Sequence, residues 1–526
     1  MKIVLTADRT LMSKYRNIPL GDFLGCVPSE RVPRKIYDFI SKVEAPLDSI
    51  GTARVAPYGL RKIEAALLRD GFSRNEVVVA HSDYLHNFIG EDTEVVVNYT
   101  MDPLGLGPVS MMFTIGHKYT SYNEIEFRSL MDTIMTIKKK RNLSFKTVVS
   151  GPGSWQLVYK FDEAKKLGID HIIQGEGDHV AAEIINRIIN NSAPEIINIT
   201  SWPSVEQIPT IVGASVQGLV EVMRGCGRGC AYCMPNMRVA RYIPIEKIVE
   251  EVKINVRYGE DTIWLHSEDI FLYKLEDKRN FIPNTEAILE LFDAVMNVDG
   301  VKHMHPTHCS IAPIVADSNL VPLSSKILRA GPDNWIGIQP GLETGSGELL
   351  RKYMANKMKP FSPDEWQDVV IEATVTLNEN YWFPAYTLIV GLPGETEDDA
   401  WETVRLLERL EYEVPERVGK EKAHFITAPL SFVPLGALKD RDFFNIEEEL
   451  NEARFNVIYR AWRIIVKEIS RSLKFLVDQP LPIKLLIELI ARAGGKAILR
   501  SIEKYGRKRG YLIKPQTTVM NIKAEL

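Results

Sequence analysis

Three of the chain's five cysteines lie in one short, glycine-rich segment that directly follows an apolar run. They are Cys226, Cys230 and Cys233, separated by three residues and then by two. A loop with this spacing can present three thiolates to one metal centre, and the other two cysteines, Cys26 and Cys309, are remote in sequence. Because four-thiolate zinc sites and electron-transfer clusters need a fourth ligand nearby, the spacing predicts an iron–sulfur cluster that keeps one iron open to another molecule.

The composition is typical of a globular, water-soluble protein with more than one domain. The 526 residues exceed the size of one ordinary core, and 45% of them are hydrophobic against 25% charged. We find no apolar stretch long enough to span a bilayer and no signal peptide before Asp8, so we expect a cytoplasmic protein. The clustered cysteines indicate a reducing compartment rather than a disulfide scaffold. A net charge of −5 gives no general case for nucleic-acid binding.

The cysteine segment resembles the Cys-x3-Cys-x-aromatic-Cys signature of the radical S-adenosylmethionine (SAM) enzymes, with Tyr232 as the aromatic residue. The resemblance implies a [4Fe–4S] cluster held by the three cysteines, with SAM bound to the fourth iron. It also implies a low-potential electron donor, because reductive cleavage of SAM yields a 5′-deoxyadenosyl radical in this family. Tyr232 is then expected to pack near the adenine of SAM.

The first part of the chain alternates strands with helices, which predicts a parallel sheet built from βαβ units. The expected strands are 2–6, 76–80, 94–98, 109–114, 147–150 and 171–174, and the expected helices are 58–70, 122–140, 155–167 and 180–190. Glycine-rich turns follow the last two strands, where open α/β sheets bind ligands, although glycine is also the ordinary turn residue. Their candidate binding residues are Ser150, Gly151, Gly153, Ser154 and Trp155 in the first turn, and Gly175, Glu176 and Gly177 in the second.

This α/β domain ahead of a radical SAM cluster resembles the cobalamin-binding domain of the B12-dependent radical SAM class. By that analogy, residues 150–155 and 175–178 line the slot for the nucleotide tail and the corrin edge of cobalamin. The loop 98–108 could form the upper wall of that pocket, or it could be a plain long turn. The Asp-x-His-x-x-Gly motif of other corrinoid domains is absent, because the nearest approach, at residues 83–90, has the wrong spacing. Cobalamin without a strong lower ligand is therefore expected, and a domain that binds nothing stays open.

A second βα series follows the proline-bearing stretch that ends at Pro209. Its expected strands are 219–223, 263–266, 301–305, 336–339, 386–390 and 425–428, and a helix at 245–257 follows the cysteine loop. Six strands, most of them followed by a helix, suit the partial (β/α)6 TIM-type barrel that the resemblance to radical SAM enzymes implies. Catalytic groups in βα barrels lie at the carboxyl ends of the strands, and the polar residues of this region cluster there.

Several of these polar residues are candidates for contacts with SAM by the same resemblance. Glu268 or Asp269 lies where the family places contacts to the SAM amino group, but the usual Gly-Gly-Glu run is absent and the choice between them stays open. Glu343 resembles the acid of the Gly-Leu-Glu-Ser/Thr-Gly turn, which is expected to touch the ribose or amino acid part. Gly391 and Gly394 look like the fifth-strand turn that passes near adenine. Each of these groups could instead only cap a helix.

A histidine-rich strand end adds weak catalytic candidates. His303, His305 and His308 lie close together in sequence, followed by Cys309. They could form a second metal site, but we favour pocket-lining groups, since the sequence does not establish a convergent ligand set. His305 and Cys309 are the weak catalytic candidates, and Cys309 could reach the open iron or quench a radical.

The fold predicted for the whole chain is α/β with three parts. Residues 1–195 form a flavodoxin-like or Rossmann-like cobalamin domain, residues 210–437 the radical SAM barrel, and residues 438–526 a helical domain. The last part contains expected helices at 446–473 and 482–493 and is expected to cover the barrel mouth or to form a dimer contact. Its basic segment 494–510 could dock an acidic partner, but a solvated helix face is the simpler interpretation.

The resemblance favours a cobalamin-dependent radical SAM methyltransferase that methylates an unactivated sp3 carbon. Archaeal enzymes that C-methylate methyl-coenzyme M reductase, for example at a glutamine, are possible relatives, and the Ile/Lys/Glu-rich texture is compatible with an archaeal source. A peptide, protein or lipid substrate is expected. The alternative is a radical SAM enzyme that catalyses a rearrangement, a coupling or a lipid modification without methyl transfer. Methylthiotransferases normally bring three more cysteines in their first domain, whereas this chain has only Cys26 there, which counts against that class. An iron–sulfur redox or regulatory sensor is also disfavoured, because it would not need the full βα series.

Overall fold

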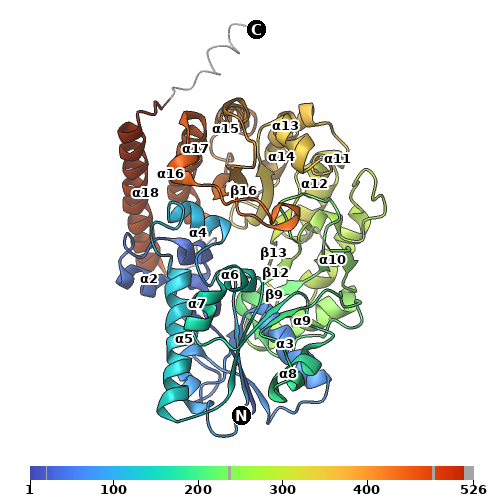
Figure 1. Ribbon diagram of the computed structural model, residues 1–526. Helices are drawn as coiled ribbons and strands as arrows, with labels where there is room; N and C mark the ends of the chain where they lie inside the picture. Colours follow the sequence, from blue (N-terminus) through green and yellow to red (C-terminus); the bar gives the residue numbers. More distant parts are fainter. Residues whose placement is uncertain (19–20, 235–237, 477–479, 514–526) are drawn as a thin grey trace. The chain divides into compact units, whose positions relative to one another are not determined.

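The computed structural model describes residues 1–18, 21–234, 238–476 and 480–513 (Figure 1). Contacts between residues divide the chain into two compact units. The first unit contains residues 1–220, 243–263 and 298–302, and the second contains the rest of the described chain. The division falls within strands β9 (Leu219–Glu221) and β12 (Thr262–His266).

The first unit is built on a six-stranded parallel sheet in the order β3-β1-β4-β5-β6-β7. In chain order this is the arrangement of flavodoxin-like folds, with a topological switch point between β1 and β4. The valine-rich strands are buried along nearly their whole length, as is usual for a parallel sheet covered on both faces. The strands are β1 (Ile3–Ala7), β3 (Val77–Val79), β4 (Val95–Tyr99), β5 (Lys146–Ser150), β6 (His171–Gln174) and β7 (Ile196–Asn198).

Helices cover the two faces of this sheet. On one face, α3 and α8 share a core with β1, in which Leu60, Leu67 and Ile184 pack with Leu5. On the other face lies α5, whose Phe127 is fully buried (Figure 1). The helices of the unit are α1 (Arg9–Met12), α2 (Arg34–Ile40), α3 (Tyr58–Arg69), α4 (Pro108–Phe113), α5 (Tyr122–Lys140), α6 (Ser154–Tyr159), α7 (Phe161–Lys166), α8 (Ala181–Ile189) and α9 (Ile245–Arg257).

Three sequence predictions for this unit were wrong in detail. Residues 109–114 were expected to be a strand but form helix α4, because Pro108 occupies its first turn and Gly107 precedes it in an extended conformation. The expected helix 155–167 is divided into α6 and α7, since Lys160 leaves the helical region (φ −112°, ψ 56°). Strand β7 was missed because it is a short edge strand with one buried residue among three.

Most of the strands expected for the partial barrel lie in the second unit, and β9 and β12 begin in the first. One sheet has the order β13-β12-β9, and a parallel sheet has the order β14-β15-β16-β17. Since only Thr307 separates β13 from β14, the strands follow one another in chain order around the barrel. The further strands are β13 (His303–Pro306), β14 (His308–Cys309), β15 (Ile336–Glu343), β16 (Trp382–Val390) and β17 (Ile426–Ser431). The helices are α10 (Thr285–Met296), α11 (Ala312–Ala316), α12 (Leu320–Ile327), α13 (Gly347–Tyr353), α14 (Trp366–Glu379) and α15 (Glu397–Val418).

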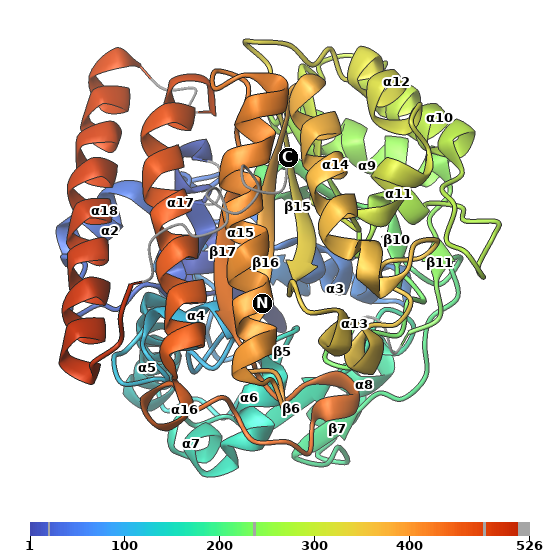
Figure 2. The same ribbon diagram turned by 90° about the horizontal axis from the view of Figure 1, so that it is seen from above.

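The carboxyl-terminal part is helical, as expected. Helix α17 (Glu452–Leu476) packs on α15 and β17, and α18 (Leu481–Arg509) packs on α17, so the three helices lie side by side (Figure 2). The expected helix 446–473 begins instead as the short α16 (Ile446–Glu449), because Leu450 is extended. Within the described residues, we find no helix with the length and apolar character needed to cross a bilayer.

Candidate functional site

A small antiparallel pair of strands closes the cysteine loop at its base. Strands β10 (Met223–Arg224) and β11 (Arg241–Tyr242) pair Met223 with Tyr242, which brings the two ends of the loop together. Gly225, Gly227 and Gly229 adopt the left-handed region with φ of 73°, 74° and 72°. A side chain at Gly225 would lie 2.8 Å from the carbonyl oxygen of Arg238. Alternating glycines therefore let the loop turn tightly between its cysteines.

Arg228, between Cys226 and Cys230, fixes the loop to the ends of the barrel strands. It is only 3% exposed and donates to Asp269 (3.2 Å), to the Ser310 hydroxyl (2.7 Å) and to the Asn356 carbonyl (2.6 Å). The Asn356 side chain in turn donates to the Arg228 carbonyl at 3.0 Å. An arginine with several buried acceptors is a rigid anchor, so the loop has a defined position.

The second half of the loop is held from two sides at Ala231. Its N–H donates to the Tyr353 carbonyl, and its carbonyl accepts from the Ala437 N–H, both at 2.8 Å. The Tyr353 hydroxyl donates to the Pro393 carbonyl at 2.6 Å, so it links the cysteine loop to the turn after β16. Gly436 leaves room for this contact, because a Cβ there would lie 2.7 Å from the Ala231 oxygen.

Two of the three thiols are buried and Cys233 is half-buried, and two buried cations lie nearby. Cys226 is 9% exposed and Cys230 is 3% exposed. Burial, and then the Asp269 carboxylate, raises the pKa of Cys226 to about 12. Burial also raises the pKa of Cys230, which Lys357 and Arg228 oppose. These surroundings favour the thiol, and a bound metal cation would stabilise the thiolate, which is the form in which cysteines bind iron.

The thiols do not already converge on a metal position. In the described part of the chain, no three cysteine, histidine or acidic side chains are arranged as a metal-binding group. The donor chemistry nevertheless fits a cluster, because three thiols share one anchored loop and Cys309 lies on strand β14 outside it. The residues that would hold a cluster are thus Cys226, Cys230 and Cys233.

Glu343 and Lys357 form a buried ion pair beside the loop. Glu343 Oε1 lies 3.1 Å from Lys357 Nζ, and the Thr387 hydroxyl donates to its Oε2 at 3.3 Å. Burial alone would lower the pKa of Lys357, but the Glu343 carboxylate beside it raises that pKa above its usual value. Gly341 is required here, since a Cβ would lie 2.2 Å from Glu343 Oε1. Burial and then this carboxylate raise the pKa of Tyr232 well above its usual range, so Glu343 lies close to the aromatic residue of the loop.

The two neighbouring acids after β12 have different surroundings. Asp269 is 2% exposed and accepts from Arg228 and from the Ser310 N–H (2.9 Å), so it supports the anchor. Glu268 accepts from the Gly225 N–H at 3.0 Å, and burial followed by the Glu221 carboxylate raises its pKa to about 7. Asp269 is therefore occupied by Arg228, whereas Glu268 contacts the cysteine loop through the Gly225 N–H and the nearby Arg238.

The turn after β16 is rigid and tied to the carboxyl-terminal helices. The Gly391 N–H donates to Glu395 Oε2 at 2.9 Å, and Arg454 of α17 donates to the same oxygen at 2.7 Å. A Cβ at Gly391 would lie 2.1 Å from the Phe444 ring, and a Cβ at Gly394 would lie 3.0 Å from Lys352 Nζ. Gly391 is therefore needed for packing within the protein itself, whereas Gly394 is favoured by its left-handed backbone (φ 75°).

The histidines at the third strand end do not form one cluster. His303 is exposed, whereas His305 packs on the Trp264 ring at 4.7 Å and accepts from the Gly337 N–H at 3.2 Å. Burial lowers the pKa of His305 and of His308 to about 4, so both rings are neutral. Cys309 is 4% exposed, and burial raises its pKa well above the usual range. His305 and His308 are thus half-buried and neutral, and Cys309 is buried, as pocket-lining groups would be.

In the first unit, the turn after β5 packs against the loop that follows β4. A Cβ at Gly151 would lie 2.5 Å from the Thr100 carbonyl, and one at Gly153 would lie 2.3 Å from the Met101 carbonyl. These glycines are thus explained by the chain's own backbone. The hydroxyls of Thr100 and Ser150, however, are buried without a hydrogen-bond partner. Buried polar atoms of this kind at the carboxyl edge of a parallel sheet fit the polar groups of a bound ligand.

The rest of this carboxyl edge is more closely packed. Ser154 is buried and begins helix α6, and Trp155 next to it is half-buried. Gly175 has a φ of 102°, and a Cβ at this position would lie 2.3 Å from the Ile199 carbonyl oxygen. Glu176 is 8% exposed and Gly177 is half-buried. The two turns predicted from sequence therefore lie at the carboxyl ends of the adjacent strands β5 and β6.

Loop 98–108 is an ordered structure with a hydrogen-bonded centre. Asp102 accepts from the Gly107 N–H at 2.8 Å and from the Gln156 amide at 2.7 Å. Gln156, on helix α6, in turn accepts from the Leu104 N–H at 2.9 Å. The loop and the turn after β5 are thus joined into one rigid rim.

Residues 220–407 match the family described as the radical SAM superfamily. This region of the chain belongs to the radical SAM superfamily. The matched range contains the cysteine loop, the ion pair of Glu343 with Lys357 and the turn after β16.

Relatives with curated descriptions are distant. The chain is 23% identical over 293 residues to a tRNA-2-methylthio-N(6)-dimethylallyladenosine synthase of Leptothrix cholodnii, covering 53% of this chain and 56% of that protein. It is 24% identical over 303 residues to the ribosomal protein uS12 methylthiotransferase RimO of a Thermotoga species, covering 54% and 62%. The chain thus spans little more than half the length of these relatives.

A solved structure shares the fold over most of the chain. The radical SAM methyltransferase TsrM from Kitasatospora setae, with cobalamin and a [4Fe-4S] cluster bound, superimposes with a TM-score of 0.52 at 14% identity. The superposition covers 83% of this chain and 77% of that chain. At this identity the likeness shows the architecture alone: a Rossmann-like sheet, a radical SAM region and a helical carboxyl terminus.

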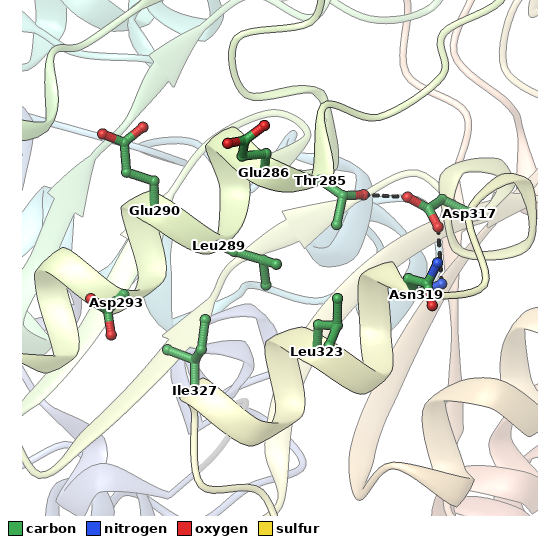
Figure 3. Close-up of a pocket in the computed structure, with 9 residues that line it drawn as sticks. All are labelled: Thr285, Glu286, Leu289, Glu290, Asp293, Asp317, Asn319, Leu323 and Ile327. Atoms are coloured by element: carbon green, nitrogen blue, oxygen red, sulfur yellow. Dashed lines mark hydrogen bonds between the residues drawn. The ribbon is translucent and has the colours of Figure 1, made fainter.

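An open groove also lies on the outside of the radical SAM region, between α10 and α12 (Figure 3). It measures about 600 Å³, with Leu289, Leu323 and Ile327 between acidic residues. Asp317 accepts from the Asn319 N–H at 2.9 Å. No residue that lines it belongs to the site around the cysteine loop.

Sequence reasoning missed the residues that position the loop. Arg228 lies within the motif, but its partners come from three other segments. The one local signal was an arginine with glycines on both sides, in a segment too tight for a solvated side chain. Lys357, Tyr353 and Gly436 carried no comparable signal.

Proposed function

We propose that the protein is a cobalamin-dependent radical SAM methyltransferase that methylates an unactivated sp3 carbon of a peptide or protein residue. The anchored cysteine loop supports this proposal most directly. Arg228 and Ala231 fix the loop at the carboxyl ends of the barrel strands, where βα barrels carry their chemistry. The cysteine loop is preceded in the chain by a parallel sheet, at whose carboxyl edge the buried hydroxyls of Thr100 and Ser150 have no hydrogen-bond partner among the described residues.

The residues divide into sets according to the group that each would hold. Cys226, Cys230 and Cys233 would hold a [4Fe–4S] cluster. The SAM contacts would come from Tyr232, Glu268, Glu343, Gly391 and Gly394, and the cobalamin contacts from Ser150 to Trp155 and Gly175 to Gly177. When bound, these groups supply reductive SAM cleavage and a carrier for the methyl group.

The chain's own charges suit this assignment. Arg228 and Lys357 place two buried positive charges near Cys230, which would offset the negative charge that three thiolates bring. Glu343 is held by Lys357 and Thr387 in a fixed position. A carboxylate fixed in this way can orient a hydroxyl or ammonium group of a ligand without reorganisation.

Methyl transfer is preferred over methylthio transfer because of the cysteine inventory. The relatives named as methylthiotransferases are 23% and 24% identical to this chain. Enzymes of that kind are expected to bring three further cysteines in their first domain, whereas the first unit here contains Cys26 alone. Cys26 is hydrogen-bonded to the Asn123 side chain at 3.4 Å, as a structural thiol would be.

The test is anaerobic reconstitution of the full chain with iron, sulfide and cobalamin. We expect cobalamin to remain bound through gel filtration and SAM to be cleaved to 5′-deoxyadenosine under reducing conditions. The triple change of Cys226, Cys230 and Cys233 to Ala should abolish cleavage. The matched control is Cys309→Ala, which removes a buried thiol outside the loop and should leave iron content and cleavage unchanged.

Two outcomes would overturn the proposal in different places. Cleavage that persists in the triple variant would remove the cluster assignment. Cleavage without retained cobalamin, and with no gain of one methyl group in the product mass, would favour a rearrangement, coupling or lipid modification in place of methyl transfer.

A further inference from the structure

Helix α18 is the outermost helix of the carboxyl-terminal layer. It is 29 residues long and packs on α17 along one side (Figure 2). Two glycines allow a close approach, because a Cβ at Gly495 would lie 2.8 Å from Val466 and one at Gly506 would lie 2.3 Å from the Phe455 ring. The packed side of α18 is therefore well defined.

The side of its first turns that α17 leaves uncovered is apolar. Leu481, Leu485 and Leu489 recur every fourth residue and are 68%, 56% and 65% exposed, and Leu486 beside them is 43% exposed. Residues four apart share one side of a helix, so these leucines form a continuous patch. Soluble helices normally turn such leucines to the core, and exposed clusters of them mark interaction sites.

The exposed side becomes strongly basic further along the same helix. Lys496 follows Leu489 by seven residues, and Arg500, Lys504 and Lys508 continue at intervals of four, all exposed. The helix period places Lys496, Arg500 and Lys504 on the side that carries the leucines, and Lys508 just beyond its edge. This basic stretch stands out in a chain whose net charge is −5.

We propose that the exposed side of α18 docks on an anionic lipid surface. The leucine patch would enter the boundary between acyl chains and headgroups, and the basic stretch would contact the headgroup phosphates. Leucines and lysines combined on one exposed helix side are the pattern of interfacial helices, whose binding adds apolar burial to attraction for anionic lipids. Attachment through α18 would be peripheral, because no helix of the described chain can span a bilayer.

A lipid surface fits α18 better than a second copy of the chain. A stable dimer interface buries about 800 Å² on each partner, which four partly exposed leucines do not approach. A second copy would also bring another basic stretch of the same sign. An anionic surface instead matches the charge of the whole stretch. The docking goes beyond the proposed methyl transfer and does not depend on it.

The test is flotation of the full chain with vesicles of phosphatidylcholine alone and with added phosphatidylglycerol. We expect binding only to the anionic vesicles, weakened by added salt. Leu485→Glu with Leu489→Glu should lower binding at least tenfold, and Arg500→Glu with Lys504→Glu should lower it similarly. The matched control, Leu47→Glu, changes a leucine of comparable exposure (44%) in the first unit and should bind as the unchanged chain does.

Three results would overturn the docking proposal. The chain could fail to float with anionic vesicles, or both pairs of α18 substitutions could leave binding unchanged. Sedimentation without lipid could instead show a dimer that the leucine substitutions dissociate, which would assign the patch to a second copy. Circular dichroism of each variant confirms that a loss of binding does not reflect unfolding.

Discussion

Gly436 lies directly against the backbone of the cysteine loop, so an alanine at this position is expected to displace the loop. Its Cβ would lie 2.7 Å from the Ala231 carbonyl oxygen and 3.0 Å from the Cys233 N–H nitrogen. Both atoms belong to the backbone and cannot rotate away. The displacement would also break the hydrogen bond from the Ala437 N–H to Ala231, which is 2.8 Å long.

The expected cost combines two effects. A non-glycine residue in the left-handed region, where Gly436 has a φ of 60°, costs about 1–2 kcal/mol. Loss of one backbone hydrogen bond costs about 1 kcal/mol. We therefore expect Gly436→Ala to lower the free energy of unfolding by about 2–3 kcal/mol. Iron and sulfide bound per chain after anaerobic reconstitution should fall, because Cys233 shares the displaced segment.

A control variant, Gly510→Ala, tests the backbone strain of an alanine in the left-handed region without any contact like that between Gly436 and Ala231. Gly510 also adopts the left-handed region (φ 77°), but a Cβ there meets nothing within 4 Å. Denaturant unfolding should show the strain alone, and iron content should match the unchanged protein. Equal iron content in the two glycine variants would refute the reasoning that Gly436 and Ala231 hold the loop.

Other predictions test the ion pair and the first unit. Lys357→Met should lower the free energy of unfolding by about 3–5 kcal/mol, because it leaves the buried Glu343 carboxylate unpaired. Adding Glu343→Gln should recover part of that loss. A double variant that is no more stable than Lys357→Met would contradict the role of the ion pair. Ser150→Ala should change the unfolding free energy by no more than about 1 kcal/mol, since the Ser150 hydroxyl has no hydrogen-bond partner in the described part of the chain. The same variant should bind cobalamin about tenfold more weakly in equilibrium dialysis. Unchanged binding would remove Ser150 from the cobalamin site. Burial raises the pKa of Asp8 to about 6, so the native state binds more protons than the unfolded chain between about pH 4 and 6 and stability falls as pH rises through that window. Asp8→Asn should flatten this dependence and raise the unfolding free energy at pH 7 by at most roughly 3 kcal/mol, as urea titrations at several pH values would show.

The sequence was informative where local patterns decide the structure. Helix α5 begins and ends where expected, because Ser121 caps it by accepting from the Glu124 N–H and lysines occupy its last turn. Strand β6 was also placed correctly between a helix and a glycine turn. The three-cysteine spacing led to the radical SAM superfamily, which the match to residues 220–407 confirms.

The sequence was uninformative where distant segments decide the structure. The wrong strand at 109–114 is an exception with a local cause, because Pro108 begins helix α4 there. The roles of Asp269 and Glu268 could not be separated from sequence, because the difference depends on whether Arg228 or Gly225 donates to each. Contacts of this kind follow from the tertiary arrangement and leave no periodic pattern.

The grip on Ala231 has a consequence for the maturation of the protein. Its two backbone partners, Tyr353 and Ala437, are synthesised long after the cysteines themselves. A nascent chain on the ribosome would therefore expose its thiols before the scaffold that orients them exists. Iron delivery should succeed only once the segment that carries Ala437 has emerged from the ribosome, which places cluster assembly late in the synthesis of the chain.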